Sequence, residues 1–159
     1  MKFSTQEEYG LRLILRIAKS NSPNGLTIPE LSEVEGLSNA NVAKILRVLR
    51  LAGFIESSRG QTGGYKLSKP TDKILVSDVL TSLGGKLYES GFCDLHAGVE
   101  SICTNTIDCS IRSLWKTIQN MIDGVLSKFT LQDLLGREIE VEALANSFAG
   151  ELESKFTKN

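Results

Sequence analysis

The most constraining feature of the sequence is a pair of helix signals separated by a single glycine. Thr27 and Glu30 match a capping box that opens a short helix, and Gly36 interrupts it. Ser38 can cap a second helix, which Gly53 ends as the residue after its last turn. Apolar residues in this second helix recur at the spacing of one helix face: Val42, Ile45, Leu46 and Leu49. Two short helices joined by a tight turn predict a helix-turn-helix.

Another helix is predicted ahead of this pair. Two capping boxes overlap at its start, Ser4 with Glu7 and Thr5 with Glu8, and a periodic apolar run follows them. We expect this helix over residues 5–19, with one apolar face made of Leu11, Ile14, Leu15 and Ala18.

The polar face of the second helix of the pair is suited to DNA. At about 100° per residue, the residues opposite its apolar stripe are Ala40, Lys44, Arg47 and Leu51, with Asn41 beside them. Small and amide side chains followed by basic ones suit a helix that enters the major groove by its N-terminal end.

Two brief strands around a glycine-rich turn come next. The segments 54–57 and 65–67 flank this turn, which contains Arg59, Gly60 and Gln61, and together they predict a β-hairpin wing. Glycines allow the backbone to approach phosphates closely, and Arg59 stands where a minor groove could receive it. A nucleotide-phosphate loop is the alternative, but the turn lacks the GxxxxGK spacing and no helix follows it. The helix-turn-helix and the wing together predict DNA binding.

The charge of the chain is divided unevenly between its two halves. The net charge is only −1, yet residues 1–70 hold ten basic and six acidic side chains, and residues 71–159 hold eight basic and thirteen acidic ones. A basic module joined to an acidic one favours a nucleic-acid partner for the first half. A solvated surface explains the same charges, so charge alone does not decide between the two.

Three more helices are predicted in the second half. The first spans about 76–83, the second is long and is capped by Asp108 or Ser110, and the last covers about 138–156. The long helix carries apolar residues in alternating steps of three and four: Ile111, Leu114 or Trp115, Ile118, Ile122, Val125 and Phe129. This spacing is similar to a coiled-coil seam and indicates pairing with a second copy in a homodimer. Packing against the chain's own core is the alternative.

The three cysteines lie within one segment, with the single histidine between the first two. Their order is Cys93, His96, Cys103 and Cys109. Cys109 lies at the predicted start of the long helix, where a thiol is predisposed to ionise and to bind metal. Three thiolates can hold an iron–sulfur cluster or Zn²⁺, although the paired CxxC spacing of structural zinc is absent. The alternative is that the three cysteines are buried independently of one another and have no shared function.

Taken in order, these features resemble the Rrf2 family of winged-helix bacterial regulators, especially its IscR-, NsrR- and RirA-like members. The matching pieces are MKFSTQEEYGLRLILRIA, the helix-turn-helix with its RGxxGGY wing, ILVSDVL, the cysteine loop and the long helix, over roughly residues 1–135. The resemblance implies a homodimer that holds an iron–sulfur cluster, [2Fe-2S] or [4Fe-4S], on Cys93, Cys103 and Cys109. It also implies DNA contacts by Ser38, Asn39, Asn41, Lys44, Arg47 and the wing residues Arg59, Gly60 and Gln61.

Two departures from the family pattern leave the fourth cluster ligand open. The first gap between cysteines is longer by several residues, and Arg112 stands where IscR-like members place a histidine. His96 is one candidate, because it lies in the extended loop, and an exposed loop histidine is its alternative. Glu8 is the other, because NsrR-like proteins offer an acidic first-helix residue from the partner subunit. For Glu8 the alternative is the capping box with Thr5. Solvent or a small thiol could also fill the site.

We therefore expect a mainly α protein with a small β-hairpin: a winged helix-turn-helix plus a long dimerisation helix. Residues 1–70 form the DNA-binding region, and residues 71–159 carry the cluster loop, the dimerisation helix and a C-terminal helix. The expected function is a transcription regulator that senses iron–sulfur status, redox state or nitric oxide, the alternative being a thiol switch or a zinc site. No nucleotide loop or catalytic base accompanies the cysteines, so an enzyme is not expected. The longest charge-free run has ten residues, so no membrane span is expected. Glu7 and Glu8 stand where a signal peptide needs an apolar core, which favours a cytoplasmic protein.

Overall fold

The computed structural model describes residues 3–20, 22–58, 63–89, 91–95, 97 and 108–156. Its first half contains three helices and a two-stranded antiparallel hairpin: α1 (Thr5–Lys19), α2 (Ile28–Glu35), α3 (Asn39–Leu51), β1 (Ile55–Ser57) and β2 (Tyr65–Leu67). The second half is helical: η1 (Thr71–Lys73), α4 (Val76–Gly84), α5 (Phe92–Leu95), α6 (Ser110–Leu126), η2 (Asp133–Leu135) and α7 (Glu138–Phe156). The prediction of a mainly α winged helix-turn-helix with a small hairpin is confirmed.

The start of α1 forms one of its two predicted capping boxes. Ser4 is the cap: its hydroxyl accepts the Glu7 N–H at 3.2 Å, and the Glu7 carboxylate accepts the Ser4 N–H at 2.7 Å. The predicted Thr5–Glu8 box is wrong, because Thr5 already lies inside the helix and the Glu8 N–H donates to the Ser4 carbonyl at 3.1 Å. The Glu8 carboxylate is exposed and makes no hydrogen bond or ion pair within the described part of the chain.

The helix-turn-helix forms as its sequence signals predict. The Thr27–Glu30 capping box opens α2, and Gly36 ends it in the left-handed region at φ 66°. Ser38 caps α3, and Gly53 follows it at φ 78°. The apolar stripes of α1 and α3 meet in one core with part of α2, where the fully buried side chains include Leu13, Ile14, Leu31, Val42, Ile45, Leu46 and Leu49.

A buried carboxylate fixes α2 to α1. The Glu35 side chain at the end of α2 is only 5% exposed, and both of its oxygens accept from α1. Arg12 Nε donates to Oε2 at 2.9 Å, and Arg16 Nε donates to Oε1 at 2.8 Å. Burial acts to raise the pKa of this carboxyl, but the hydrogen bonds and charges of Arg16 and Arg12 prevail and hold the pKa below its ordinary value. Glu35 is therefore charged at neutral pH and positions α2.

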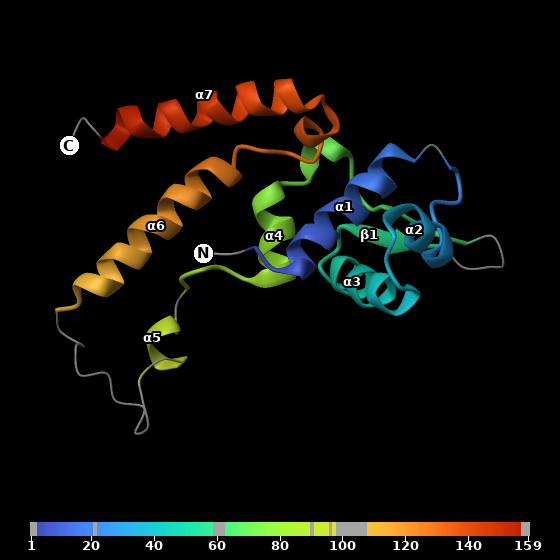
Figure 1. Ribbon diagram of the computed structural model, residues 1–159, viewed down its shortest axis with the longest axis horizontal. Helices are drawn as coiled ribbons and strands as arrows, with labels where there is room; N and C mark the ends of the chain where they lie inside the picture. The colour runs from blue at the N-terminus through green and yellow to red at the C-terminus, as the bar shows by residue number, and fades with distance from the viewer. Residues whose placement is uncertain are drawn as a thin grey trace.

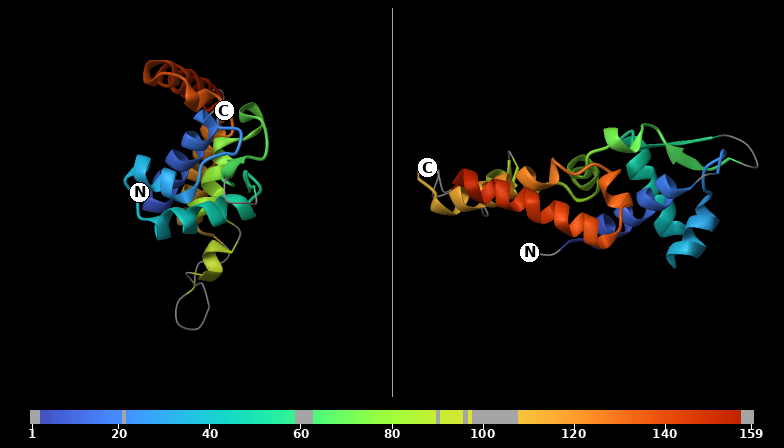
Figure 2. Two further views of the ribbon diagram at one scale, coloured as in Figure 1. Left: turned by 90° about the vertical axis from the view of Figure 1, so that its right-hand side faces the viewer. Right: turned by 90° about the horizontal axis from the view of Figure 1, so that it is seen from above.

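The second half extends away from the winged helix as an arm. Figure 1 shows α4 between the winged-helix elements and the antiparallel pair α6 and α7, and Figure 2 shows the molecule elongated along that direction. A second apolar cluster holds the arm, in which Phe129 meets Phe148 of α7 edge to face at 5.1 Å between ring centroids. No helix of the described residues is long and apolar enough to cross a membrane.

The long helix differs from its prediction at both ends. Its cap is Cys109, not Asp108 or Ser110, because the Cys109 sulfur accepts the Arg112 N–H at 3.3 Å. The helix ends at Leu126, so Phe129 lies beyond it in a turn and does not continue the α6 seam. Before α6, where no periodicity is present, the chain also forms the short helix α5.

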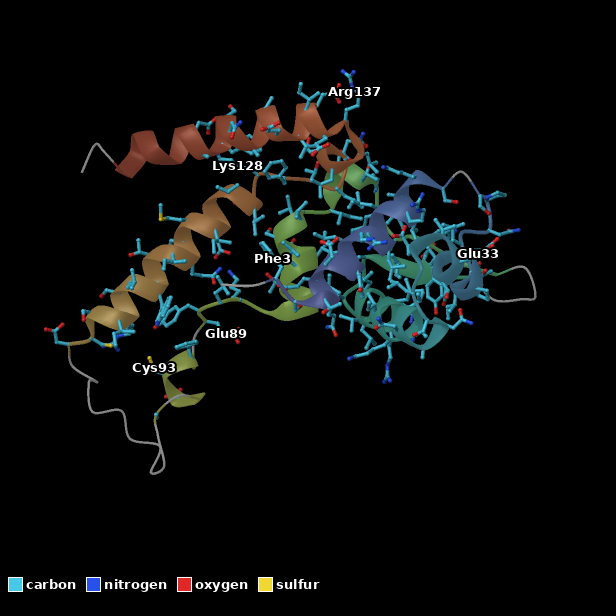
Figure 3. All side chains as sticks on the ribbon, viewed as in Figure 1. Phe3, Glu33, Glu89, Cys93, Lys128 and Arg137 are labelled. Atoms are coloured by element: carbon cyan, nitrogen blue, oxygen red, sulfur yellow. The ribbon has the colours of Figure 1, made fainter. Side chains whose placement is uncertain are left out.

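The Glu35 clamp gives a stability prediction. Glu35→Gln keeps the shape of the side chain but removes the charge that both guanidinium groups face, and we expect a loss of about 1–3 kcal/mol in the free energy of unfolding at neutral pH. Urea unfolding of wild type and variant measures it. The matched control is Glu33→Gln on the exposed side of α2 (Figure 3), which should stay within about 0.5 kcal/mol of wild type.

The same clamp predicts a pH dependence. Because folding lowers the pKa of Glu35, its contribution is fully present above the unfolded-state pKa and is lost as the pH falls through the folded-state pKa. The stability difference between wild type and Glu35→Gln should therefore shrink in acid. A difference that is constant from neutral to acidic pH would contradict the charged clamp.

Candidate functional site

The polar face of α3 is free of contacts with the core. Ser38 and Asn39 at its start are exposed, as are Lys44 and Arg47 one and two turns on, whereas Asn41 is half-buried. The Ser38 hydroxyl accepts the Asn41 N–H at 3.3 Å and so closes the N-terminal end of the helix. The same face also carries Ala40 and Leu51, whose side chain is 73% exposed. The structure thus presents the predicted groove-facing residues together on one surface.

The wing is built on a third chain segment that the sequence reasoning missed. β1 and β2 pair with Glu56 opposite Lys66, whose side chains form an ion pair at 3.2 Å. Leu26 adds an antiparallel bridge to β2, exchanging backbone hydrogen bonds with Tyr65 at 3.0 and 2.8 Å. Gly25 allows this approach: its φ is 79°, and a Cβ there would lie 2.3 Å from the Tyr65 carbonyl oxygen. Arg59, Gly60 and Gln61 at the tip lie outside the described residues.

Two of the three cysteines lie at the far end of the arm. Cys93 is on α5, in Figure 3 at the end nearest α6, and Cys109 caps α6; both are half-buried free thiols. Both act electrostatically on the same phenol, that of Tyr88. Cys103 and His96 lie outside the described residues. Within the described part of the chain, no group of three His, Cys, Asp or Glu side chains is assembled as a metal site.

Tyr88 connects the cysteines to α6. Its burial, then the charge and hydrogen bond of the Cys93 sulfur, raise the pKa of the Tyr88 phenol above its ordinary value, with Arg112 opposing and Cys109 adding to the effect. The Tyr88 ring lies 5.3 Å from that of Phe92. Its backbone N–H donates to the Gln119 side chain of α6 at 3.0 Å. Sequence reasoning missed Tyr88, since only the fold shows which side chains reach the cysteines.

An apolar cavity separates the arm from the DNA-binding half. It has a volume of about 480 Å³ and lies between α4, α6 and the start of α1. Its apolar lining includes Phe3, Leu80, Leu87, Met121, Ile122 and Val125. The polar side chains Gln119 and Asp123 stand at its α6 wall.

A helix-turn-helix with an exposed basic helix face, followed by a hairpin, defines a winged-helix DNA-binding regulator. The family model described as "Rrf2: Iron-dependent Transcriptional regulator" matches residues 3–137. The chain belongs to the Rrf2 family, whose members are transcriptional regulators and not enzymes.

Individual relatives match over most of their length. The protein rrf2 of Nitratidesulfovibrio vulgaris Hildenborough is 33% identical over 135 residues, which cover 85% of this chain and 87% of that protein. The structure of CymR, the global cysteine regulator of Bacillus subtilis, superposes with a TM-score of 0.66 at 27% identity, covering 85% of this chain and 96% of that one. The T. potens IscR structure has a TM-score of 0.65 at 29% identity, with 85% and 86% covered. The family match ends before α7.

The exposed α3 face predicts the effect of two substitutions on DNA binding. Lys44→Ala and Arg47→Ala should each raise the Kd for an operator selected from random duplex DNA about tenfold, because each removes one charge or base contact worth about 1–3 kcal/mol. Fluorescence anisotropy at several salt concentrations measures this. Lys116→Ala, an exposed lysine on α6, is the control and should bind as wild type does. Unchanged affinity in both α3 variants would contradict a role for this face.

Proposed function

We propose that the chain is a DNA-binding transcription regulator that senses iron–sulfur status, redox state or nitric oxide through a cluster, [2Fe-2S] or [4Fe-4S], held by Cys93, Cys103 and Cys109. The observation that carries this proposal is that Cys93 on α5 and Cys109 at the cap of α6 are both half-buried free thiols in the arm, away from the DNA-binding face. Soft thiolate donors suit iron–sulfur clusters. The cluster, when bound, would supply iron that reacts with oxygen or nitric oxide.

The structure bears on the choice between the two candidate fourth ligands. Because Ser4 and not Thr5 caps α1, the Glu8 carboxylate is left exposed in the first turn and is available to a partner subunit. His96 is the second candidate, on the loop between Cys93 and Cys103. In this proposal, Glu8 or His96 completes the site, and a carboxylate or an imidazole would hold its iron more weakly than a fourth thiolate does.

In the DNA complex, residues 1–70 act as the reading region and residues 71–159 as the sensing and pairing region. Side chains Ser38, Asn39, Asn41, Lys44 and Arg47 contact the major groove, and Arg59, Gly60 and Gln61 contact the backbone or minor groove. The protein works as a homodimer in the cytoplasm, where the operator is. The apolar residues in the first turns of α6 support pairing, since they stay open to solvent in the single chain: Ile111 is 59%, Leu114 54% and Trp115 40% exposed.

A second reading uses the cysteines without a cluster. Solved relatives at 28–30% identity include Staphylococcus aureus CymR, one of whose structures is described as an oxidized form. A thiol switch or a zinc site on the same cysteines is therefore the alternative. Both readings place the sensing site on the same cysteines, and they differ only in whether these bind a cluster, bind zinc or are oxidised.

Metal and sulfide analysis of anaerobically purified protein separates the two readings. We expect iron and acid-labile sulfide in near-equal amounts, with visible absorption that bleaches or changes in air. Cys93→Ser, Cys103→Ser and Cys109→Ser should each abolish the cluster, whereas Ser113→Ala on α6 should retain it. Zinc alone, or no metal after anaerobic reconstitution with ferrous iron and sulfide, would contradict the cluster and favour the thiol or zinc reading.

The open face of α6 predicts the effect of a charge on dimerisation. Leu114→Glu places a carboxylate in the apolar surface, and we expect it to shift the protein to monomers in sedimentation velocity experiments. Asn120→Glu, an exposed position pointing away from the apolar residues of the same helix, adds the same charge and should leave the dimer intact. A Leu114→Glu protein that sediments as a dimer would show that α6 does not form the interface.

A further inference from the structure

Tyr88 is held at both of its ends. Its ring packs on that of Phe92, the residue before Cys93 on α5, at 5.3 Å between ring centroids, and its backbone N–H donates to Gln119 Oε1 at 3.0 Å. Cys93 is on α5, and Gln119 is near the middle of α6. One residue therefore links a cysteine of the candidate sensing site to the long helix.

Gln119 uses its whole carboxamide in this link. Its side chain is 6% exposed, and its Nε2 donates to Asp123 Oδ1 at 2.9 Å. The other Asp123 oxygen pairs with Lys86 Nζ at 2.8 Å. Lys86 and Tyr88 belong to the stretch that leaves α4, so one turn of α6 holds both ends of that stretch. Both hydrogen-bonding functions of Gln119 thus serve the connection between α4 and the cysteines.

An apolar residue at this position would serve packing equally well. The neighbours of Gln119 along α6, Ile118 and Ile122, are partly buried, and the cavity beside it is mostly apolar. Replacing a hydrogen-bonded polar group and its partners by apolar groups is often neutral for stability. A buried glutamine at this position therefore lowers stability by burying a polar group, but its side chain fixes the position of Tyr88.

We propose that Gln119 is the positioning residue that couples the state of the cysteines to the DNA-binding half. This inference rests on the proposed function, because it requires that the cysteines change state. When Cys93 moves, Tyr88 leaves Gln119, and α6 is released from the stretch that follows α4. When Cys93 keeps the position that the structure shows, the Tyr88–Gln119 bond holds α6 against the stretch that follows α4. The two arrangements are the two states that an allosteric element requires.

The test compares operator affinity between two states of each protein. Wild type, Gln119→Met and the control Asn120→Leu are reconstituted anaerobically with ferrous iron and sulfide, and a portion of each is then stripped of metal with a chelator. The ratio of the two Kd values is the coupling, which for allosteric proteins is typically about 5–150-fold. We expect the ratio of Gln119→Met to fall to within about twofold of one, with iron and sulfide per chain unchanged. Asn120→Leu should keep the wild-type ratio.

A second readout does not depend on a loaded site. In the reduced, metal-free protein, the Tyr88 amide should exchange its hydrogen about tenfold faster in Gln119→Met than in wild type, because its acceptor is gone. Tyr88→Ala keeps the amide bond but removes the ring that packs on Phe92 of α5. This variant should therefore lower the ratio of the two Kd values while leaving the hydrogen exchange of the residue 88 amide unchanged. If Gln119→Met does not fold, this variant tests the coupling in its place.

The outcomes separate the two proposals. A wild-type protein whose operator affinity is the same in both states overturns the sensing function and the coupling with it. A folded Gln119→Met protein that keeps the wild-type ratio overturns the coupling alone. Loss of the cluster in Gln119→Met also overturns it, since Gln119 would then be part of the cluster's support and not a link to DNA binding.

Discussion

The structure depends on one apolar face of α4 that packs against two clusters. Val79 and Leu83 belong to the core of the winged helix, whereas Val76 and Leu80, one turn away, belong to the cluster with Phe129. Residues spaced i, i+3, i+4 and i+7 lie on one helix face, so a single face of α4 is shared between the two clusters. The arm and the DNA-binding half are thus packed on one rigid element, and neither can move without α4 or its packing changing.

The contact between α4 and α1 leaves little room for adjustment. A Cβ at Gly10 of α1 would lie 2.4 Å from the Leu83 side chain, so a larger residue there would force Leu83 to shift. Gln6 Nε2 also donates to the Leu83 carbonyl at 2.5 Å. Since α1 in turn carries the arginines that hold Glu35 at the end of α2, a displacement at α4 reaches the helix-turn-helix through close-packed and hydrogen-bonded contacts.

Elements whose signals are local were predictable from the sequence. The starts of α1, α2 and α3 follow from Ser4, Thr27 and Ser38, and the ends of α2 and α3 from Gly36 and Gly53, because a cap and its bond partner lie within four residues. The Glu35 clamp, the bridge from Leu26 to the wing and the Tyr88–Gln119 bond join segments 19 to 39 residues apart. No periodicity or capping pattern encodes such pairs, so they required the fold. The wrong prediction of a Thr5–Glu8 capping box also arose because local patterns do not decide it. The Ser4–Glu7 and Thr5–Glu8 pairs match the capping-box pattern equally well, but only one residue can be the cap.

The two ends of α6 are held by interactions of different strength. At its C-terminal end, the chain that follows the helix is fixed to the start of α4: the Val76 N–H donates to the Phe129 carbonyl at 2.9 Å, and the Leu131 N–H donates to the Ile74 carbonyl at 2.8 Å. The α7 helix, which lies beyond the family match, packs Phe148 on this same end. At its N-terminal end, by contrast, α6 is capped by Cys109, and the Tyr88–Gln119 link holds the helix near its middle.

This asymmetry determines how a chemical change at the cysteines can act on DNA binding. Backbone hydrogen bonds and a buried aromatic pair at the C-terminal end resist displacement. The side-chain interactions near the middle, the Tyr88–Gln119 hydrogen bond and the Lys86–Asp123 ion pair, resist it to a lesser degree. In the proposed coupling, a perturbation at Cys93 or Cys109 would rotate α6 about its end at α4, and the first contacts to change would be those of Gln119 and the cavity wall. The same rotation would reorient the exposed apolar turns of α6 that the dimer is proposed to use. A change in cysteine chemistry would in this way alter the spacing of two DNA-binding halves without altering the fold of either.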